Sequence, residues 1–469
     1  NARAAEQRAH AIQGFLVDDL LLAATPEEAR GRKPLVQEAL ALAARRAGSA
    51  LVARPEVEHH VRGVLGEAFL RLGELDLARE QIARERELGR SLALPADIVR
   101  AADMRELKLL LARAENGAAA TLAERLDRDL ALSAPASESR WLAHAYLGLA
   151  VQRQGNYAAA ESLLREAEAG LGSVPGAGRS RLEALALLVA NLTLQRKDIE
   201  TEPVARRLLE ETGALLGVDH PDRVRALDSW AQTLRRLRRR PEARAAAEQA
   251  IALGERVLSP THPATLNSRL TLAFILWDLR DFSAAEAQGE KLLRLATAAL
   301  GATHPTTARA EELFAILLSA RGEFDRAAEL YARSLKTFRA AYGDLHSVTL
   351  RTLRNQISFA RRRGDEAAVD AGNRFILNLA HQALAEPELD PVLTSDLAYF
   401  AVSCEPAQQR EPALAVALAE RAVAATARRW PDALSTLSLA HELSGEPARA
   451  IAVMLEAFEN PDSWLASGF

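Results

Sequence analysis

The sequence predicts an all-α protein, an elongated α-solenoid of about ten stacked helical hairpins. The chain has 469 residues, 49% of them hydrophobic and 26% charged, so it is long and apolar enough to bury an extended core. Ala, Leu, Arg and Glu, which favour helices, dominate, and the alternation typical of strands is nearly absent. A repeat of fixed period then indicates how the helices are organised.

The repeat is carried by a motif in the middle of the chain. Histidines stand at positions 220, 262, 304 and 346, each 42 residues after the one before. Other columns keep the same period: Ala231, Ala273 and Ala315; Leu234, Leu276 and Leu318; Phe282 and Phe324; Ala243, Ala285 and Ala327. Within a unit, two helical runs are separated by a break, so each unit is predicted to be a hairpin whose helices cross at the small alanines.

The same form recurs more loosely outside this block. Gly73, Gly155, Gly322 and Gly445 are each followed by a polar residue and, five residues after the glycine, by an alanine. Glycine is suited to end the first helix of a hairpin, and alanine allows the second helix to pack closely. The pattern predicts these helix pairs: 56–72 with 75–90, 96–114 with 118–132, 138–154 with 157–170, 179–196 with 202–215, 221–238 with 241–257, 263–280 with 283–299, 305–321 with 324–341, 347–363 with 366–384, 390–403 with 411–428, and 431–444 with 447–459.

The glycine-to-alanine hairpin resembles the tetratricopeptide repeat. The 42-residue form, with Leu-Gly-x-x-His-Pro between units, is similar to the variant found in kinesin light chains and many bacterial proteins, and residues 217–346 carry it best. The resemblance implies a right-handed superhelix whose concave groove, lined by first helices, binds a protein or peptide. Kinesin light chains grip peptide backbone with an Asn-Asn pair in the first helix, of which this sequence keeps only Asn355.

A second resemblance lies in the N-terminal segment. Phe15-Leu-Val-Asp-Asp-Leu20, Ala24-Thr-Pro26 and Arg30-Gly-Arg32 look like the segment that precedes the repeats in bacterial receptor-type Ser/Thr protein kinases. In that family a cytoplasmic kinase domain and one membrane helix come first. The resemblance implies that this chain is a soluble fragment, tethered by a membrane helix before residue 1, on the periplasmic, extracytoplasmic side of a bacterial inner membrane.

Four segments are expected along the chain. They are an N-terminal helical cap or membrane-proximal segment at 1–54, divergent repeats at 55–216, regular 42-residue repeats at 217–386, and C-terminal repeats with a cap at 387–469. Extra residues between 174 and 178 interrupt the phase of the divergent repeats. The last hairpin is expected to close the stack near Asn460-Pro461-Asp462-Ser463-Trp464.

The sequence contains no catalytic or cofactor signature. The phosphate loop and the kinase motifs His-Arg-Asp and Asp-Phe-Gly are absent, so we expect no cofactor, no metal and no activity of the fragment itself, although the full-length protein is implied to be a Ser/Thr protein kinase. A net charge of −4 gives no reason to expect nucleic acid as a partner. The lone Cys404 is expected to be buried, and His59 and His60 to lie on a solvated face.

The histidine column has two interpretations. Three of its members precede a proline, a residue suited to the first turn of a helix, so the column is expected to cap or pack against the turns between hairpins. The alternative is a pH-responsive or metal-binding edge, because His titrates near neutral pH. Shared metal coordination is the least favoured reading, since neighbours are one hairpin apart.

Counting from the crossing alanines identifies the residues expected to face the groove. Phe274, Trp277 and Ile316 form an apolar patch flanked by arginines, a combination that is common in protein interfaces. The alternative is that Trp277 fills the gap between hairpins and that the arginines form a solvated face. The predicted ligand-binding residues are Arg235, Asn267, Phe274, Trp277, Arg309, Ile316, Arg351, Arg354, Asn355 and Arg361.

These features predict a non-catalytic sensor or docking domain of a bacterial transmembrane Ser/Thr kinase. Its partner is expected to be a protein or peptide segment with an apolar anchor and acidic residues, bound in the concave groove. The alternative is a cytoplasmic tetratricopeptide scaffold, or a peptide-responsive regulatory domain of a transcriptional regulator. An enzyme with an unfamiliar site is the third and least favoured class.

Overall fold

The computed structural model describes residues 36–459, apart from 155, 196, 387, 388, 427 and 429. These residues form twenty-one α-helices and one short 3₁₀ helix, with no strand among them, which confirms the all-α prediction. The chain divides into two compact units, Asn1–Ala150 and Val151–Phe469. The kinase-like N-terminal motifs at 15–32 and the predicted closing segment at 460–464 lie outside the described residues, and the expected segment boundaries at 54, 216 and 386 stay predictions.

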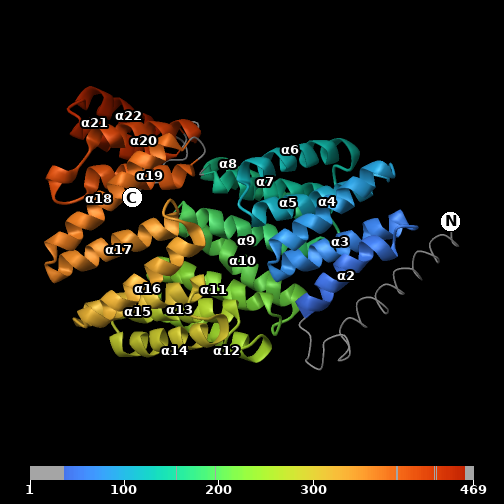
Figure 1. Ribbon diagram of the computed structural model, residues 1–469, viewed down its shortest axis with the longest axis horizontal. Coiled ribbons are helices and arrows are strands. Elements are labelled where there is room, and N and C mark those ends of the chain that lie inside the picture. The colour runs from blue at the N-terminus through green and yellow to red at the C-terminus, as the bar shows by residue number, and fades with distance from the viewer. Residues whose placement is uncertain are drawn as a thin grey trace. The chain divides into compact units, whose positions relative to one another are not determined.

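The first unit is built from consecutive antiparallel helices (Figure 1). Its helices are α2 (Val36–Ala50), α3 (Pro55–Leu72), α4 (Leu75–Ser91), α5 (Ala96–Ala112), α6 (Asn116–Ser133) and most of α7 (Glu138–Arg153). Helices α3 and α4 pack closely because Gly66 carries no side chain; a Cβ there would lie 2.7 Å from Cγ1 of Ile82. Leu65 and Phe69 are buried against Ile82 in the core of this unit.

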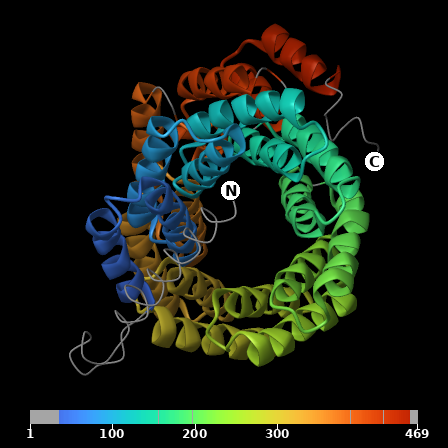
Figure 2. The same cartoon turned by 90° about the vertical axis from the view of Figure 1, so that its right-hand side faces the viewer.

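The second unit continues the pattern, and its hairpins follow one another in chain order (Figure 2). Its helices up to the regular block are α8 (Tyr157–Gly172), α9 (Gly178–Leu194) and α10 (Asp198–Leu216). The regular block contains α11 (Asp222–Arg236), α12 (Arg240–Val257), α13 (Pro263–Asp278), α14 (Phe282–Leu300), α15 (Pro305–Arg321), α16 (Phe324–Tyr342), α17 (Ser347–Arg363) and α18 (Glu366–Ala385). The last helices are α19 (Pro391–Ser403), η3 (Ala407–Gln409), α20 (Pro412–Ala425), α21 (Pro431–Leu443) and α22 (Pro447–Glu459).

All twenty predicted hairpin helices are present among the described residues, and no end differs by more than four positions. The largest difference is at α10, which begins at Asp198 although the sequence suggested a start at 202. The structure places Pro203 inside the helix and places Asp198 and Glu200 in the first turn, where carboxylates favour the positive end of the helix dipole.

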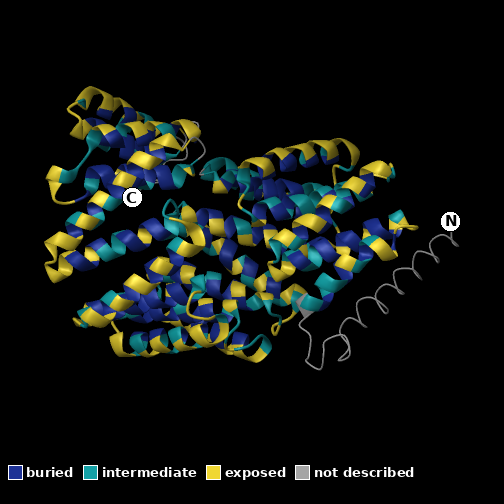
Figure 3. Cartoon of the chain, viewed as in Figure 1, coloured by how far each residue is buried: buried dark blue, intermediate teal, exposed yellow. Residues whose placement is uncertain are grey.

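The alanine columns have the predicted packing role. Ala231, Ala273 and Ala315 on the first helices are completely buried, as are their counterparts on the second helices. Each helix is therefore buried along one side and exposed along the other (Figure 3). Gly372 on α18 plays the same role in the next hairpin, because a Cβ at this position would lie 2.6 Å from Cγ1 of Ile357.

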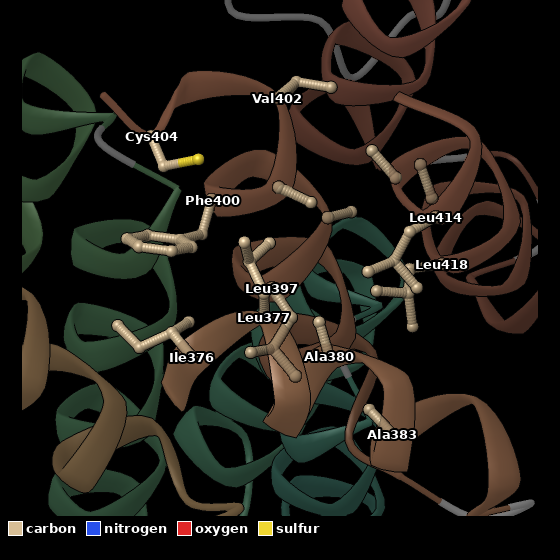
Figure 4. Close-up of a cluster of buried hydrophobic side chains, with 14 of the residues drawn as sticks. Ile376, Leu377, Ala380, Ala383, Leu397, Phe400, Val402, Cys404, Leu414 and Leu418 are labelled. Carbon is tan, nitrogen blue, oxygen red and sulfur yellow. The ribbon is translucent and has the colours of Figure 1, made fainter. Parts of the chain in front are cut away.

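Cys404 is buried, as expected, beside Phe400 in the core formed by α18, α19 and α20 (Figure 4). Burial raises the pKa of the Cys404 thiol, which keeps it protonated at neutral pH. The expectation of a solvated face is wrong for His59, which is buried, whereas His60 is exposed. His59 fits against α4 because Gly89 leaves space there; a Cβ on Gly89 would lie 3.3 Å from its Nε2.

The histidine column caps the first helices. Nδ1 of each histidine accepts a hydrogen bond from the backbone N–H two residues later, at 3.1 to 3.2 Å, on His220, His262, His304 and His346. Gly217, Gly301 and Gly343 precede these caps with a positive φ of 80° to 95°, a conformation that favours glycine and ends each second helix. The recurring Gly-x-x-His sequence therefore encodes the turn between hairpins.

Capping makes part of the stability depend on pH. An imidazole accepts at Nδ1 only while that atom is unprotonated, and burial lowers the pKa of His262 and His346 from 6.5, with Arg225 adding to the effect at His262. The folded state thus binds fewer protons than the unfolded state. The stabilising contribution is complete above about pH 6.5 and is lost as the pH falls further.

When the pH falls from about 7.5 to about 5.5, we expect the free energy of unfolding to decrease less in the double variant His262→Asn/His346→Asn than in the wild type. Asparagine accepts the same capping bond and does not titrate, and each cap contributes about 1 kcal/mol. Urea denaturation at both pH values measures the difference. Equal losses in the two proteins would show that the caps do not respond to protonation.

Candidate functional site

The predicted groove face is one side of four successive first helices, α11, α13, α15 and α17. Positions 42 residues apart share an environment along this face. Arg225, Asn267, Arg309 and Arg351 are all exposed, and so are Gln232 and Ser358. We use "groove face" for the exposed and half-buried residues of these columns: Arg225, Gln232, Arg235, Asn267, Phe274, Trp277, Arg309, Ile316, Arg351, Arg354, Ser358 and Arg361.

The apolar part of the groove face is attached to the core of the regular block. Phe274 and Ile316, one repeat apart, are half-buried and pack on the buried cluster that contains Ala273 and Leu276. Trp277 is also half-buried, but its ring stands edge-on to Phe282 at the start of α14, with centroids 4.9 Å apart. Trp277 therefore fills a gap inside its own hairpin, while Phe274 and Ile316 offer apolar surface.

Arg235 joins neighbouring repeats across the groove face. Its Nε donates to Oδ2 of Asp278 at 2.6 Å, and its guanidinium lies 5.2 Å from the ring centre of Phe274. The side chain is about one-third exposed. This geometry holds the guanidinium over the phenyl ring of Phe274 in a cation–π contact.

The column that aligns with the kinesin light chain Asn pair is used for contacts between repeats. Glu312 on α15 is buried and accepts from Nδ2 of Asn355 at 2.9 Å, from the Thr352 hydroxyl at 3.0 Å and from Nη2 of Arg351 at 3.2 Å, all on α17. Asp228 occupies the same position on α11 and is also buried. Asn355 is thus engaged by a carboxylate of the preceding repeat.

Burial raises the pKa of Asp228, and Thr271, Gln232 and Ser268 oppose the rise by hydrogen bonding. Two of these groups lie on α13, so the polar environment of Asp228 also spans two repeats. Glu312 therefore connects α15 to α17 by direct hydrogen bonds, a role that the sequence alone did not reveal.

The remaining arginines form a positive surface towards the C-terminal side of the groove face. The pKa of Arg309 is lowered, first by desolvation within the surrounding protein and second by the charge of Arg351. Arg354 lies 6.0 Å from the ring centre of Tyr399 on α19. Arg361 instead approaches Glu405, with 3.7 Å between Nη1 and Oε2. Arg309 and Arg351 thus lie on neighbouring repeats within electrostatic influence of each other, and Arg351 is also paired with Glu312.

A cavity of about 420 Å³ extends this face towards the start of the second unit. It lies between α9, α10 and α11 and combines apolar walls, including Leu182 and Leu208, with two basic and two acidic residues, Arg179, Arg225, Glu183 and Asp222. Arg225 belongs to the same column as Asn267. Sequence reasoning missed the cavity because α9 precedes the regular 42-residue block, so its positions could not be aligned by counting.

In the described part of the chain, no group of three or more His, Cys, Asp or Glu side chains is placed to hold a metal ion. None of the helices described is both long and apolar enough to cross a membrane.

Comparisons with known proteins identify the repeats. The tetratricopeptide repeat family model matches residues 222–298 and 270–340. No curated protein matches the chain. The similar solved structures include a Rap protein complexed with competence and sporulation factor, with 14% identity over 79% of this chain and 98% of that chain and a TM-score of 0.51. They also include aspartyl phosphate phosphatase F from Bacillus subtilis, with 13% identity over 84% of this chain and 92% of that chain and a TM-score of 0.46. A putative kinesin light chain from Podosopora anserina with nearly identical repeats has 20% identity over 44% of this chain and 98% of that chain and a TM-score of 0.38.

The family match coincides with the block in which the histidine, alanine and glycine columns repeat. The Rap structure shares the α-solenoid fold over most of both chains. Tetratricopeptide repeats generally serve protein–protein interaction rather than catalysis. Residues 222–340 are tetratricopeptide repeats, and they form the regular part of an all-α solenoid.

Proposed function

We propose that this chain binds a protein or peptide segment along the groove face, through an apolar anchor and acidic residues. The observation that carries the proposal is that the groove face combines half-buried Phe274 and Ile316 with exposed Arg309 and Arg351. An apolar side chain would cover the half-buried rings and aliphatic groups, and carboxylates would pair with guanidinium groups in bidentate fashion. The cavity beside Arg225 supplies a second recess for an apolar side chain.

We further propose that the chain is the sensor part of a receptor-type Ser/Thr kinase, outside the cytoplasmic membrane. This finer proposal rests on the N-terminal motifs between Phe15 and Arg32 and on their resemblance to that kinase family. Groove occupancy would then be transmitted to a kinase domain that is not part of these residues. Capture of a partner from a periplasmic extract, and not from a cytoplasmic one, would support this placement.

The second candidate is a cytoplasmic scaffold or peptide-responsive regulator. It is favoured by the similarity to a Rap protein whose structure contains competence and sporulation factor. Capture of a partner only from the cytoplasmic extract would favour this function. Both candidates use the same groove face, so the binding experiment below tests what they share.

Reversing the charge of both Arg309 and Arg351 to glutamate is expected to weaken binding of an acidic, apolar peptide at least tenfold. The loss follows from replacing two charge-assisted hydrogen bonds by repulsion, and tenfold corresponds to about 1.4 kcal/mol. Fluorescence anisotropy with labelled twelve-residue peptides of Leu, Phe, Asp and Glu measures it. Peptides with Lys and Arg in place of the acids test the sign of the charge.

The matched control for this experiment is a charge reversal away from the groove face. Arg326→Glu and Arg333→Glu lie on the second helix α16, and both side chains are about as exposed as that of Arg351. We expect these changes to leave binding unaltered. If the acidic and basic peptides bind equally, or if the double reversal on the groove face has no effect, the proposal is wrong.

A further inference from the structure

The first unit contains a cavity of about 350 Å³, lined by residues of α3, α4 and α5 and of the turn before α5. Small-molecule sites have volumes of roughly 300–1,000 Å³, so the cavity has room for a small ligand. Part of its wall is apolar, because Val57 is buried there and Leu94 and Ile98 are half-buried. We call it the "α3–α5 cavity". It shares no residue with the groove face.

A buried histidine with an unsatisfied nitrogen lines the α3–α5 cavity. His59 is only 5% exposed, and its Nε2 atom has no hydrogen-bond partner among the described residues. On the α4 side the ring lies against Gly89, which has no side chain to offer one. A buried polar atom without a partner costs free energy. A partner for Nε2 can therefore come from a molecule in the cavity.

The only guanidinium among the residues that line the cavity is already neutralised. Nε and Nη2 of Arg105 donate to the two carboxylate oxygens of Glu85, at 3.0 and 2.5 Å, and Glu85 is fully buried. Gly63 on α3 makes room for this ion pair, since a Cβ there would lie 2.5 Å from Oε1 of Glu85. Arg105 thus leaves no unpaired positive charge that would attract an anion.

The other charges around the α3–α5 cavity favour a cation. Glu56 and Asp97 are exposed residues of its lining, and Asp97 makes no ion pair or hydrogen bond with the described residues. Burial lowers the pKa of His59, which keeps the imidazole neutral at neutral pH. Among the charges that act on His59, Glu85 has a larger effect than Arg105.

We propose that the α3–α5 cavity binds a small aliphatic primary amine in its ammonium form. The ammonium group donates a hydrogen bond to Nε2 of His59, with the imidazole proton on Nδ1. The carboxylates of Glu56 and Asp97 compensate the charge of the ligand, and its hydrocarbon chain covers the apolar part of the wall. This site is independent of peptide binding on the groove face.

Isothermal titration calorimetry of the full 469-residue chain at about pH 7.5 tests the proposal. The probes are n-pentylamine, 1-pentanol and pentanoate, which share one chain length and differ in charge. We expect n-pentylamine to bind one site per chain, at least about tenfold more tightly than pentanoate, because like charges oppose the anion. The absence of n-pentylamine binding, or equal binding of pentanoate, overturns the proposal.

Four variants locate the site. Asp97→Asn is expected to raise the dissociation constant of n-pentylamine several-fold, whereas Asp76→Asn, at an exposed aspartate in the first turn of α4, is the matched control and should not change it. Ala101→Trp fills the cavity from an exposed position of its lining and should abolish binding. His59→Leu should weaken binding by removing the acceptor, with circular dichroism verifying that the variant is helical. Unchanged binding in both Asp97→Asn and Ala101→Trp would show that the amine binds elsewhere, and the proposal would be wrong.

Discussion

Replacing Arg62 by methionine is expected to destabilise the first unit by about 3–5 kcal/mol, the effect of removing one partner from a buried ion pair. Arg62 and Glu58, one turn apart on α3, are both buried. The guanidinium also donates to the carbonyl oxygen of Ala44 at 3.0 Å and to Oε1 of Gln81 at 2.5 Å. It therefore joins α2, α3 and α4, and methionine would leave the carboxylate of Glu58 with only Arg84 as a cationic partner.

The same helix supplies the matched control. Arg71 and Glu67 have the same four-residue spacing and the same 3.3 Å between nitrogen and oxygen, but the Arg71 side chain is 79% exposed. Exposed pairs contribute about 0–1 kcal/mol because water screens them. Arg71→Met should therefore change stability little. Comparing it with Arg62→Met tests the effect of burial on two pairs that have the same spacing and the same distance.

Hydrogen exchange of the amides in α3 and α4 measures both variants without assuming that the two units unfold together. The double variant Glu58→Gln/Arg62→Met is expected to recover part of the loss, because it replaces the buried carboxylate that has lost one of its two arginine partners by a neutral amide. Equal exchange rates in Arg62→Met and Arg71→Met would contradict the assigned role of burial.

The helices could be predicted from sequence because their determinants are local. Helical spacing of apolar residues, positive-φ glycines and N-terminal prolines act within a few residues, and the 42-residue period aligns them between units. The predicted start of α10 is four residues late, because the acidic residues of its first turn, Asp198 and Glu200, were not counted as part of the helix.

The site could be predicted only in outline, since side-chain pairing depends on neighbours that the period does not specify. Counting identified the exposed column of Asn267, Arg309 and Arg351 but could not show that Trp277 contacts Phe282. The cavity beside α9 lies outside the phase of the regular repeats. Likewise, the burial of His59 depends on Gly89 in the next helix, a contact without a sequence signature.

Replacing Glu312 by alanine is expected to cost about 2–3 kcal/mol and to loosen α17 specifically, since hydrogen bonds to a buried charged acceptor are among the stronger ones. The change removes the acceptor shared by Arg351, Thr352 and Asn355. Glu312→Gln retains an acceptor oxygen and should cost less. Hydrogen exchange of α17 is the measurement, and α13, on the other side of α15, provides an internal reference.

Glu311, the residue before Glu312, provides a matched comparison for this experiment. Glu311 is also buried on α15, but it accepts from Nε of Arg333 on α16, at 2.7 Å, inside its own hairpin. Glu311→Ala should therefore accelerate exchange in α16 and leave α17 protected, while Glu312→Ala should do the reverse. If both variants loosen the same helices, the carboxylates stabilise the block as a whole. Separate effects would mean that Glu311 stabilises its own hairpin and that Glu312 attaches the next one. Glu312 would then also hold Asn355, and Arg351 of the groove face, in position.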